Sequence, residues 1–449
     1  MTPTPTPTPA EATPAAAATS TATATPSADA PPAAALDAWR VLSLDLPRLH
    51  ADLAAGRPDA FAARLAALPP LTGADLDALA DDLARLAALD VLMVEAVARR
   101  HRLDLPPRTA AAVADAVGAV ARRCGIPPIL SYPLYIRVNP TDMAAIRRFT
   151  PLAAEFRFIR MHRLIEDVFD RLIAGLDRVL DAPDRAAALA AAMPGLRADF
   201  RLVNRTMAAF RSPARIDRHA FVDGFRPYFE PVLDPATGRT VLEGPSGLQS
   251  PTYRIIAMQI GYRDRVMDGW TDRIAACHDP ATRARLAAAR AARDAGRSLT
   301  AVCDAVLGPA PDLPHLHPAY AADIPALLGA ALAGGYVSPD IVATFAHFAL
   351  PLGEWPAEAP ADGEAPPRMA APPVAPVGRA TLADLAEIEA MLFGMHLEHA
   401  AVAAVQIGAV RGTGGTSGVE FLLLATFRRA FPRLWLSGLG ANLAGGLGG

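Results

Sequence analysis

Apolar residues recur three and four positions apart along most of the chain, which is the spacing of the buried face of an amphipathic helix. No segment shows the apolar–polar alternation of a half-buried strand convincingly. We therefore expect an all-α fold. The periodic stretches predict helices within residues 36–122, 151–180, 186–210, 251–295, 324–350 and 382–410.

Prolines, glycines and shifts of composition divide the chain into regions. The N-terminal Thr-Pro repeats and the Ala/Pro/Thr stretch after them predict disorder, because such segments bury too little apolar surface. A later stretch rich in Pro, Ala and Glu interrupts the helical pattern. The expected regions are a disordered tail at 1–35, a helical N-terminal module at 36–130, a large helical domain at 131–437 with a Pro-rich linker or loop at 354–377, and a frayed Gly-rich tail at 438–449.

Composition narrows the class of function. The 449 residues include no lysine, so all 43 basic residues are arginine. A Schiff-base enzyme needs an amine nucleophile and a Walker-type phosphate loop needs its lysine, so both classes are excluded. The net charge of −3 gives no attraction to nucleic acid or to an anionic membrane, and no uncharged apolar segment of about 18 residues is found. We therefore expect neither nucleic acid nor a membrane as a partner.

The location follows from two further features. The tail at 1–35 lacks both the basic start and the apolar core of a signal peptide. Three scattered cysteines without metal-ligand spacing are typical of a reducing compartment. We therefore expect a cytoplasmic protein.

Two histidines on the last predicted helix are candidates for chemistry. His396 and His399 are three positions apart, near one helical face, and alanines follow His399. A neutral imidazole on a rigid helix is a common axial ligand of heme iron, and alanines leave room for a flat macrocycle. The alternatives are an ordinary core histidine and a zinc ligand, although no third zinc ligand is visible nearby.

A glycine-rich segment, GTGGTSG at residues 412–418, follows this helix. Glycine permits positive φ and the close approach of a ligand to the backbone. The segment could end the helix or bind a ligand, whereas a phosphate loop would need lysine and a preceding strand.

Three separated motifs resemble the tryptophan 2,3-dioxygenase superfamily, which also contains the indoleamine 2,3-dioxygenases and the PrnB-like enzymes. GTGGTSG is similar to the family's GTGGSSG loop and stands at the same distance from the histidine that binds heme. FRFIRMHRLIEDV at 156–168 resembles the distal helix. FRPYF at 225–229 and SGLQS at 246–250 resemble FREYL and SGFQS. The motifs keep the family's order across most of residues 150–430.

The resemblance implies a heme-binding domain with heme b as cofactor and O2 as co-substrate. His399 would be the axial ligand of the heme iron. His162 would receive the indole N–H, with a solvated histidine as the alternative. Ser246 and Gly247 would lie near the heme edge and the oxygen site, with a helix N-cap as the alternative.

The substrate-binding residues implied by the resemblance are Phe158, Arg226 and Thr413. Phe158 would lie on the indole face, Arg226 would bind the carboxylate, and Thr413 would contact the ammonium group. Their alternatives are core packing, a structural ion pair and a helix-stop hydroxyl. A gapless alignment places Arg239 at the carboxylate instead, because residues 230–245 form an insertion relative to the family.

The expected function is that of a heme-dependent oxygenase. It would insert O2 across the indole C2–C3 bond of tryptophan or a substituted indole amino acid, giving an N-formylkynurenine-type product. The alternative within the superfamily is a PrnB-like or hydroxylating heme enzyme that remodels a tryptophan- or tyrosine-derived substrate in specialised metabolism. A helical scaffold without cofactor is the third reading. The N-terminal module does not resemble the family's, which leaves the oligomeric state open, a homo-oligomer included.

Overall fold

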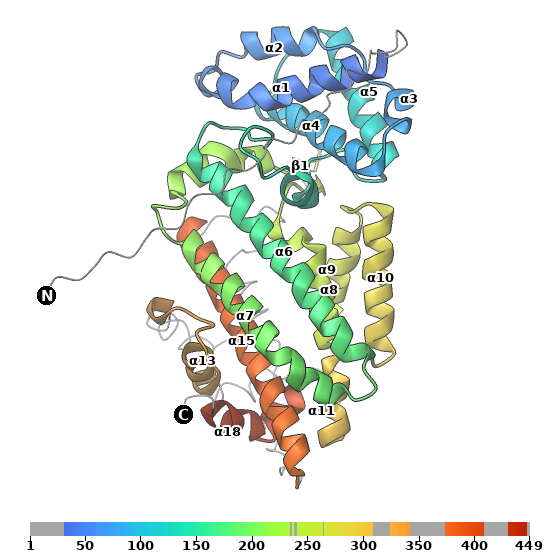
Figure 1. Ribbon diagram of the computed structural model, residues 1–449. Coiled ribbons are helices and arrows are strands. Elements are labelled where there is room, and N and C mark those ends of the chain that lie inside the picture. The colour runs from blue at the N-terminus through green and yellow to red at the C-terminus, as the bar shows by residue number, and fades with distance from the viewer. Residues whose placement is uncertain are drawn as a thin grey trace, which may run out of the picture.

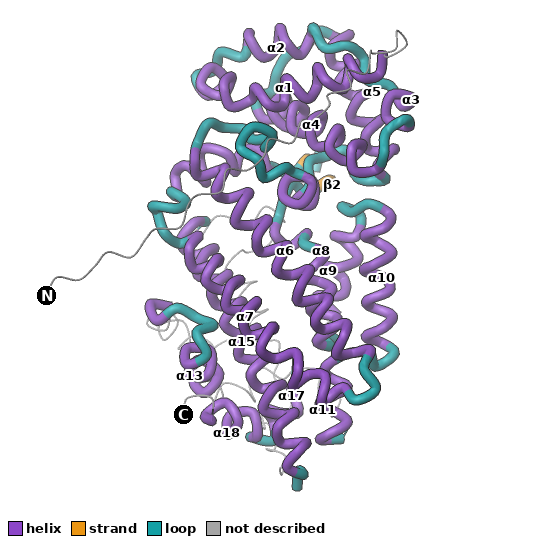
Figure 2. The backbone as a smooth tube through the Cα atoms, viewed as in Figure 1, coloured by secondary structure: helices purple, strands orange, loops and turns teal. Residues whose placement is uncertain are grey.

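The computed structural model describes residues 31–233, 236–237, 240–263, 265–308, 324–341, 373–407 and 430–446. Within these ranges the chain is almost entirely helical, as Figure 2 shows. The strands found there are β1 (Val232–Leu233) and β2 (Thr240–Leu242), which pair as one antiparallel ribbon. The all-α prediction is confirmed. Of the tail expected at 1–35, residues 1–30 lie outside the described part, and the rest begins the first helix.

Five helices form the N-terminal module, at the top of Figure 1. They are α1 (Pro31–Ala54), α2 (Asp59–Ala66), α3 (Gly73–Asp77), α4 (Asp81–Arg100) and α5 (Pro107–Cys124). α4 is the central one, because it packs against both α1 and α5. A buried ion pair joins α4 to the loop before the main domain: Arg147 Nε donates to Asp90 Oδ1 over 2.8 Å.

Three long helices make the core of the main domain: α6 (Ala153–Asp181), α7 (Arg185–Phe210) and α15 (Pro376–Gln406). α7 lies between the other two and packs on both (Figure 1). Shorter helices cover this layer, namely α8 (Pro251–Ile260), α9 (Arg265–Ala275), α10 (Pro280–Asp294), α11 (Leu299–Leu307), α13 (Ile324–Ala333), α17 (Pro432–Leu436) and α18 (Leu439–Gly445).

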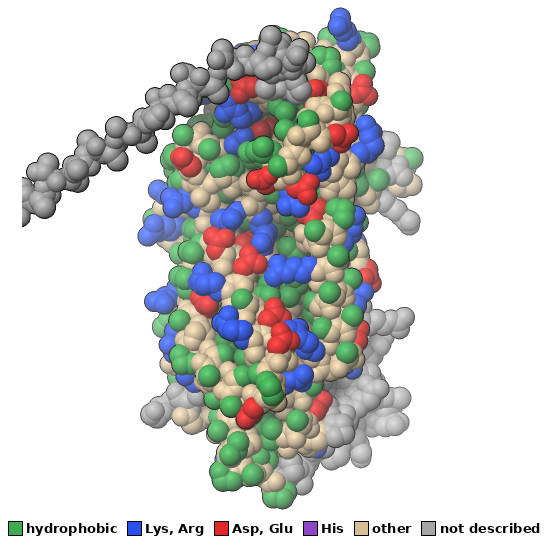
Figure 3. Space-filling model, turned by 45° about the vertical axis from the view of Figure 1, so that its right-hand side comes forward, with side chains coloured by type: hydrophobic (Ala, Val, Ile, Leu, Met, Phe, Trp, Pro, Cys, Tyr) green, Lys and Arg blue, Asp and Glu red, His purple; other side chains and the backbone are tan. Residues whose placement is uncertain are grey.

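α15 is the most apolar of the long helices. By length and composition it could cross a membrane, but 78% of its most apolar window is buried inside the protein. That burial is typical of the central helix of a packed core. On the face in Figure 3, arginine and acidic side chains are interspersed, with no large field of one sign.

The segment predicted as one helical stretch over 251–295 is divided into α8, α9 and α10. α8 ends at Gly261, whose φ of 112° is a conformation that L side chains rarely adopt. α10 begins after Asp279, whose side chain accepts a hydrogen bond from the N–H of Thr282 and caps the helix. Each of these two helix boundaries is therefore set by a residue at the helix end itself.

The segment at 211–250, rich in proline and glycine, has more regular structure than its composition suggests. It contains the π-helical turn η2 (Ala220–Phe225), the 3-10 turns η3 (Arg226–Phe229) and η4 (Gly247–Gln249), and the β1–β2 ribbon. Buried aromatic side chains, including Phe225 and Phe229, hold these turns against α6.

The C-terminal segment differs from the frayed tail that we expected. Residues 439–445 form α18, which packs on α13 and α15. α18 also packs against α17, and Gly440 permits that contact, because a Cβ added there would lie 2.3 Å from Cδ2 of Trp435. The linker expected at 354–377 is described only from residue 373, and α15 already begins at Pro376.

Candidate functional site

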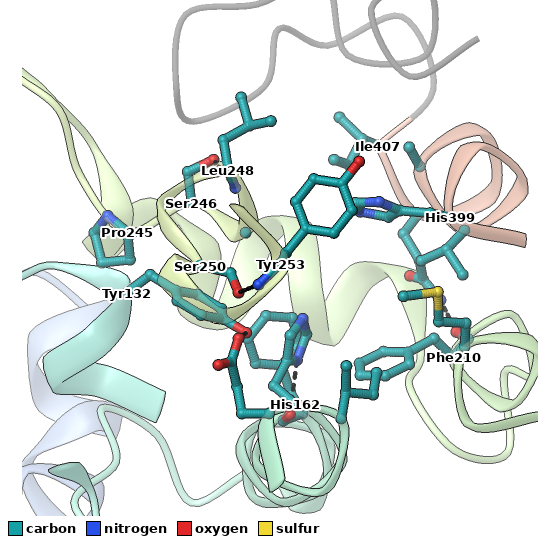
Figure 4. Close-up of a pocket in the computed structure, with 18 of the residues that line it drawn as sticks. Tyr132, His162, Phe210, Pro245, Ser246, Leu248, Ser250, Tyr253, His399 and Ile407 are labelled. Atoms are coloured by element: carbon teal, nitrogen blue, oxygen red, sulfur yellow. Dashed lines mark hydrogen bonds between the residues drawn. The ribbon is translucent and has the colours of Figure 1, made fainter. Parts of the chain in front are cut away.

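A cavity of about 220 Å³ lies between α6, α7, α15 and the segment at 216–250. Side chains from all these elements point into it (Figure 4). Most of its walls are apolar or aromatic. Six of the seven predicted site residues line it: Phe158, His162, Arg226, Ser246, Gly247 and His399. Thr413 and the alternative carboxylate ligand Arg239 lie outside the described residues.

His162 points from α6 into the cavity (Figure 4). Its Nδ1 lies 2.9 Å from the carbonyl oxygen of Phe158. A carbonyl oxygen only accepts, so Nδ1 must donate, and Nε2 is left with a lone pair. The ring is partly accessible because it borders the cavity, yet it is surrounded by protein. Burial lowers its pKa to about 4, so the imidazole is neutral at neutral pH.

Aromatic rings fix the orientation of His162. The ring centroid of Phe158 lies 4.1 Å from that of the histidine, and the centroid of Phe210 lies 4.6 Å away. Phe158 also stacks on Phe221 at 5.4 Å. One side of the cavity is therefore an aromatic wall in which His162 Nε2 is a hydrogen-bond acceptor.

His399 points into the cavity from α15 (Figure 4). Burial lowers its pKa to about 4, which keeps the imidazole neutral and able to ligate. The described residues make no hydrogen bond to its ring. His396, one turn earlier, is different: its Nε2 lies 2.7 Å from the hydroxyl oxygen of Tyr253. His396 therefore has a partner at Nε2 but none among the described residues at Nδ1, and the His399 ring has none at either nitrogen.

A buried carboxylate at the cavity, Glu166, was not found by the sequence analysis. It accepts hydrogen bonds from the hydroxyl of Tyr132 (3.0 Å), the guanidinium of Arg137 (2.9 Å) and the hydroxyl of Thr252 (2.6 Å). The signal was present, because Glu166 follows His162 by one helical turn and shares its face. Its ion pair with Arg137 compensates the buried charge.

Arg226 is the first residue of η3 and lines the cavity beside Phe229. Burial lowers its pKa, while the charge of nearby Glu230 acts in the opposite direction. A guanidinium in this setting can bind an anionic group that enters the cavity.

Ser246 and Gly247 lie at the start of η4. The Ser246 hydroxyl accepts a hydrogen bond from the N–H of Leu248 over 3.3 Å. It therefore caps η4, while Ser250 caps α8. A Cβ added to Gly247 would meet nothing within 4 Å, so this position has free space on its cavity side. Both positions are compatible with a bound group beside the loop.

The side chains around the cavity limit the kinds of metal centre that the protein could bind there. No cluster of three or more His, Cys, Asp or Glu side chains suited to a bare metal ion occurs among the described residues. A neutral histidine such as His399 is a side chain that can serve as the one protein ligand of a porphyrin-bound iron.

No protein-family model matches the chain, and no curated protein matches it either. What the cavity binds is therefore inferred from the motifs and from the arrangement of the side chains that line it.

Proposed function

We propose that this chain binds heme b through His399 and uses O2 to oxidise tryptophan or a substituted indole amino acid. The reaction expected is oxygen insertion across the indole C2–C3 bond, which gives an N-formylkynurenine-type product. One observation carries the proposal: His162 and His399, from two different helices, face the same largely apolar cavity as neutral imidazoles.

The apolar lining of the cavity on the side of α15 suits contact with a flat apolar macrocycle ligated by His399. His399 is followed along the cavity side of the helix by the small side chains of Val402 and Ala403. The volume of about 220 Å³ lies below the roughly 300–1,000 Å³ of most small-molecule sites. We therefore expect the surrounding side chains to move outward when the cofactor binds.

Each part of an indole amino acid has a partner in the cavity. Phe158 offers a ring face to the indole. His162 Nε2 is an acceptor for the indole N–H, because Nδ1 is bound to a carbonyl. Arg226 supplies the positive charge for the carboxylate, a charge-assisted pair that fixes orientation as well as contributing affinity.

Bound heme would supply the activation of O2, which side chains alone cannot perform. The chain would hold the substrate in one orientation and exclude water. The aromatic wall of Phe158 and Phe210 excludes water from the indole side. The free space beside Gly247 would leave room for a diatomic ligand next to the substrate. Orientation of this kind is a large part of the rate enhancement in many enzymes.

The test is spectroscopic and then chemical. The full chain is purified after expression with heme supply, and a Soret band is sought with and without L-tryptophan. The reduced protein is then given L-tryptophan and O2, and the product mass is measured. Gain of both oxygen atoms supports the proposal. Gain of one atom or loss of nitrogen supports a hydroxylating or PrnB-like enzyme, and a colourless protein that binds no heme contradicts both.

His162→Ala separates the roles of the two histidines. We expect this variant to keep its heme and to lose turnover or alter the product, because the proposed role of His162 is to orient the indole. Loss of heme from this variant would mean that the two sides of the cofactor have been interchanged.

A further inference from the structure

Gln406, a polar side chain at the cavity, has an acceptor atom for which the described residues offer no donor. Gln406, near the end of α15, is only 4% exposed and lines the cavity. Its Nε2 donates to the carbonyl oxygen of Phe210 over 2.7 Å and to that of Ile216 over 3.1 Å. No donor among the described residues lies within hydrogen-bonding distance of Oε1.

The orientation of the Gln406 amide is fixed by its partners. Both groups beside Nε2 are carbonyls, which only accept, so the amide cannot be turned over without placing oxygen against oxygen. Oε1 is therefore held away from these carbonyls. A buried acceptor without a donor destabilises the protein, and a ligand that supplies the donor recovers that energy as affinity.

A ligand that satisfies Gln406 Oε1 as well as His162 Nε2 must carry a second donor. A single N–H satisfies one acceptor well, and His162 Nε2 is the acceptor already assigned to the indole N–H. In an amino acid bound through its carboxylate, the remaining donor is the α-ammonium group, which has three N–H bonds. Phe210, whose carbonyl holds Gln406, also lines the cavity, and an aromatic face attracts a cation.

We propose that Gln406 binds the α-ammonium group of the ligand through Oε1, an inference that rests on the proposed function. An ammonium group has three N–H bonds, so it can donate to Oε1 and still have donors left for other acceptors.

The test compares two ligands that differ only in this group. Dissociation constants of L-tryptophan and indole-3-propionate are measured by calorimetry on the heme-loaded full chain and on Gln406→Met. We expect the wild type to prefer tryptophan. In Gln406→Met, tryptophan should bind about tenfold more weakly or worse, and indole-3-propionate should change by less than about threefold.

Gln259→Met is the matched control. The Gln259 amide is also 4% exposed, its Nε2 donates to the carbonyl of Ile173 and to Asp177, and its Oε1 also lacks a donor among the described residues. It lies on α8 and does not line the cavity. We expect this variant to leave both dissociation constants unchanged.

The outcomes separate the inference from the proposed function. If Gln406→Met weakens both ligands equally or neither, the residue is structural and the inference is wrong. If the wild-type protein binds both ligands equally well, the inference is also wrong, and no variant is needed to show this. A wild type that binds neither overturns the proposed function and the inference with it.

Discussion

The stability of the cofactor-free chain should fall steeply as the pH is lowered from 8 to 5. His162, His396 and His399 border the same cavity, and burial lowers their pKa values to about 4, 3 and 4. Each value is below the 6.5 of an unfolded histidine, so the unfolded chain binds more protons between pH 6.5 and about 4. The stabilisation is therefore complete above pH 6.5 and is lost as the pH falls through this window.

The magnitude follows from the same values. At pH 5 the unfolded histidine is almost fully protonated and the folded one is not, which costs about 2 kcal/mol of folding free energy per residue. The three histidines together cost about 6 kcal/mol, against a total stability of roughly 5–15 kcal/mol for a typical domain. Protonation of these side chains alone could therefore remove much of the stability.

Denaturant unfolding followed by circular dichroism at pH 8, 7, 6 and 5 measures this loss. Comparison with His162→Phe isolates one histidine, because the carboxylates are common to both proteins. We expect the variant to lose about 2 kcal/mol less than the wild type between pH 8 and 5. Equal pH dependence in wild type and His162→Phe would refute the reasoning.

Further predictions concern the cofactor, the substrate and the C-terminal helix. His399→Ala should fold but bind little heme. Stoichiometric heme with an unchanged ferrous spectrum would contradict the assignment of His399 as the heme ligand. Arg226→Leu should weaken tryptophan binding by more than about tenfold in calorimetry and remove discrimination against tryptamine, which lacks the carboxylate. Gly440→Ala should lower the free energy of unfolding by about 1–3 kcal/mol, because its Cβ would overlap Trp435, whereas Gly445→Ala, with nothing within 4 Å, should not.

The long helices were predictable because their signals are local and repeated. α6 (Ala153–Asp181) and α7 (Arg185–Phe210) fall within two residues of the ranges that apolar periodicity predicts. The short helix α18 was not predictable in the same way. A glycine-rich segment has low helix propensity, and α18 depends instead on its tertiary contacts with α13, α15 and α17, where Gly440 leaves room for Trp435.

The residues that motifs selected also come together in space, which composition alone could not have indicated. Phe158 and His162 share one face of α6, while Arg226 and Ser246 reach the same cavity from turns that the chain forms much later. Glu166 was missed although it shares that face, since a carboxylate on a helix is usually a solvated residue. Only the tertiary contact with Tyr132 and Thr252 marks it as part of the site.

The orientation of two polar side chains, His162 and Gln406, could not be predicted from the sequence. The tautomer of His162 is set by a carbonyl one turn earlier on its own helix, so it depends on an i to i−4 contact that helix geometry makes possible. The direction of the Gln406 amide depends on the carbonyls of Phe210 and Ile216, about 190 residues earlier in the chain. In sequence, Gln406 is an ordinary polar residue of an apolar helix. Its oxygen is turned away from those two carbonyls because two distant segments of backbone occupy its donors.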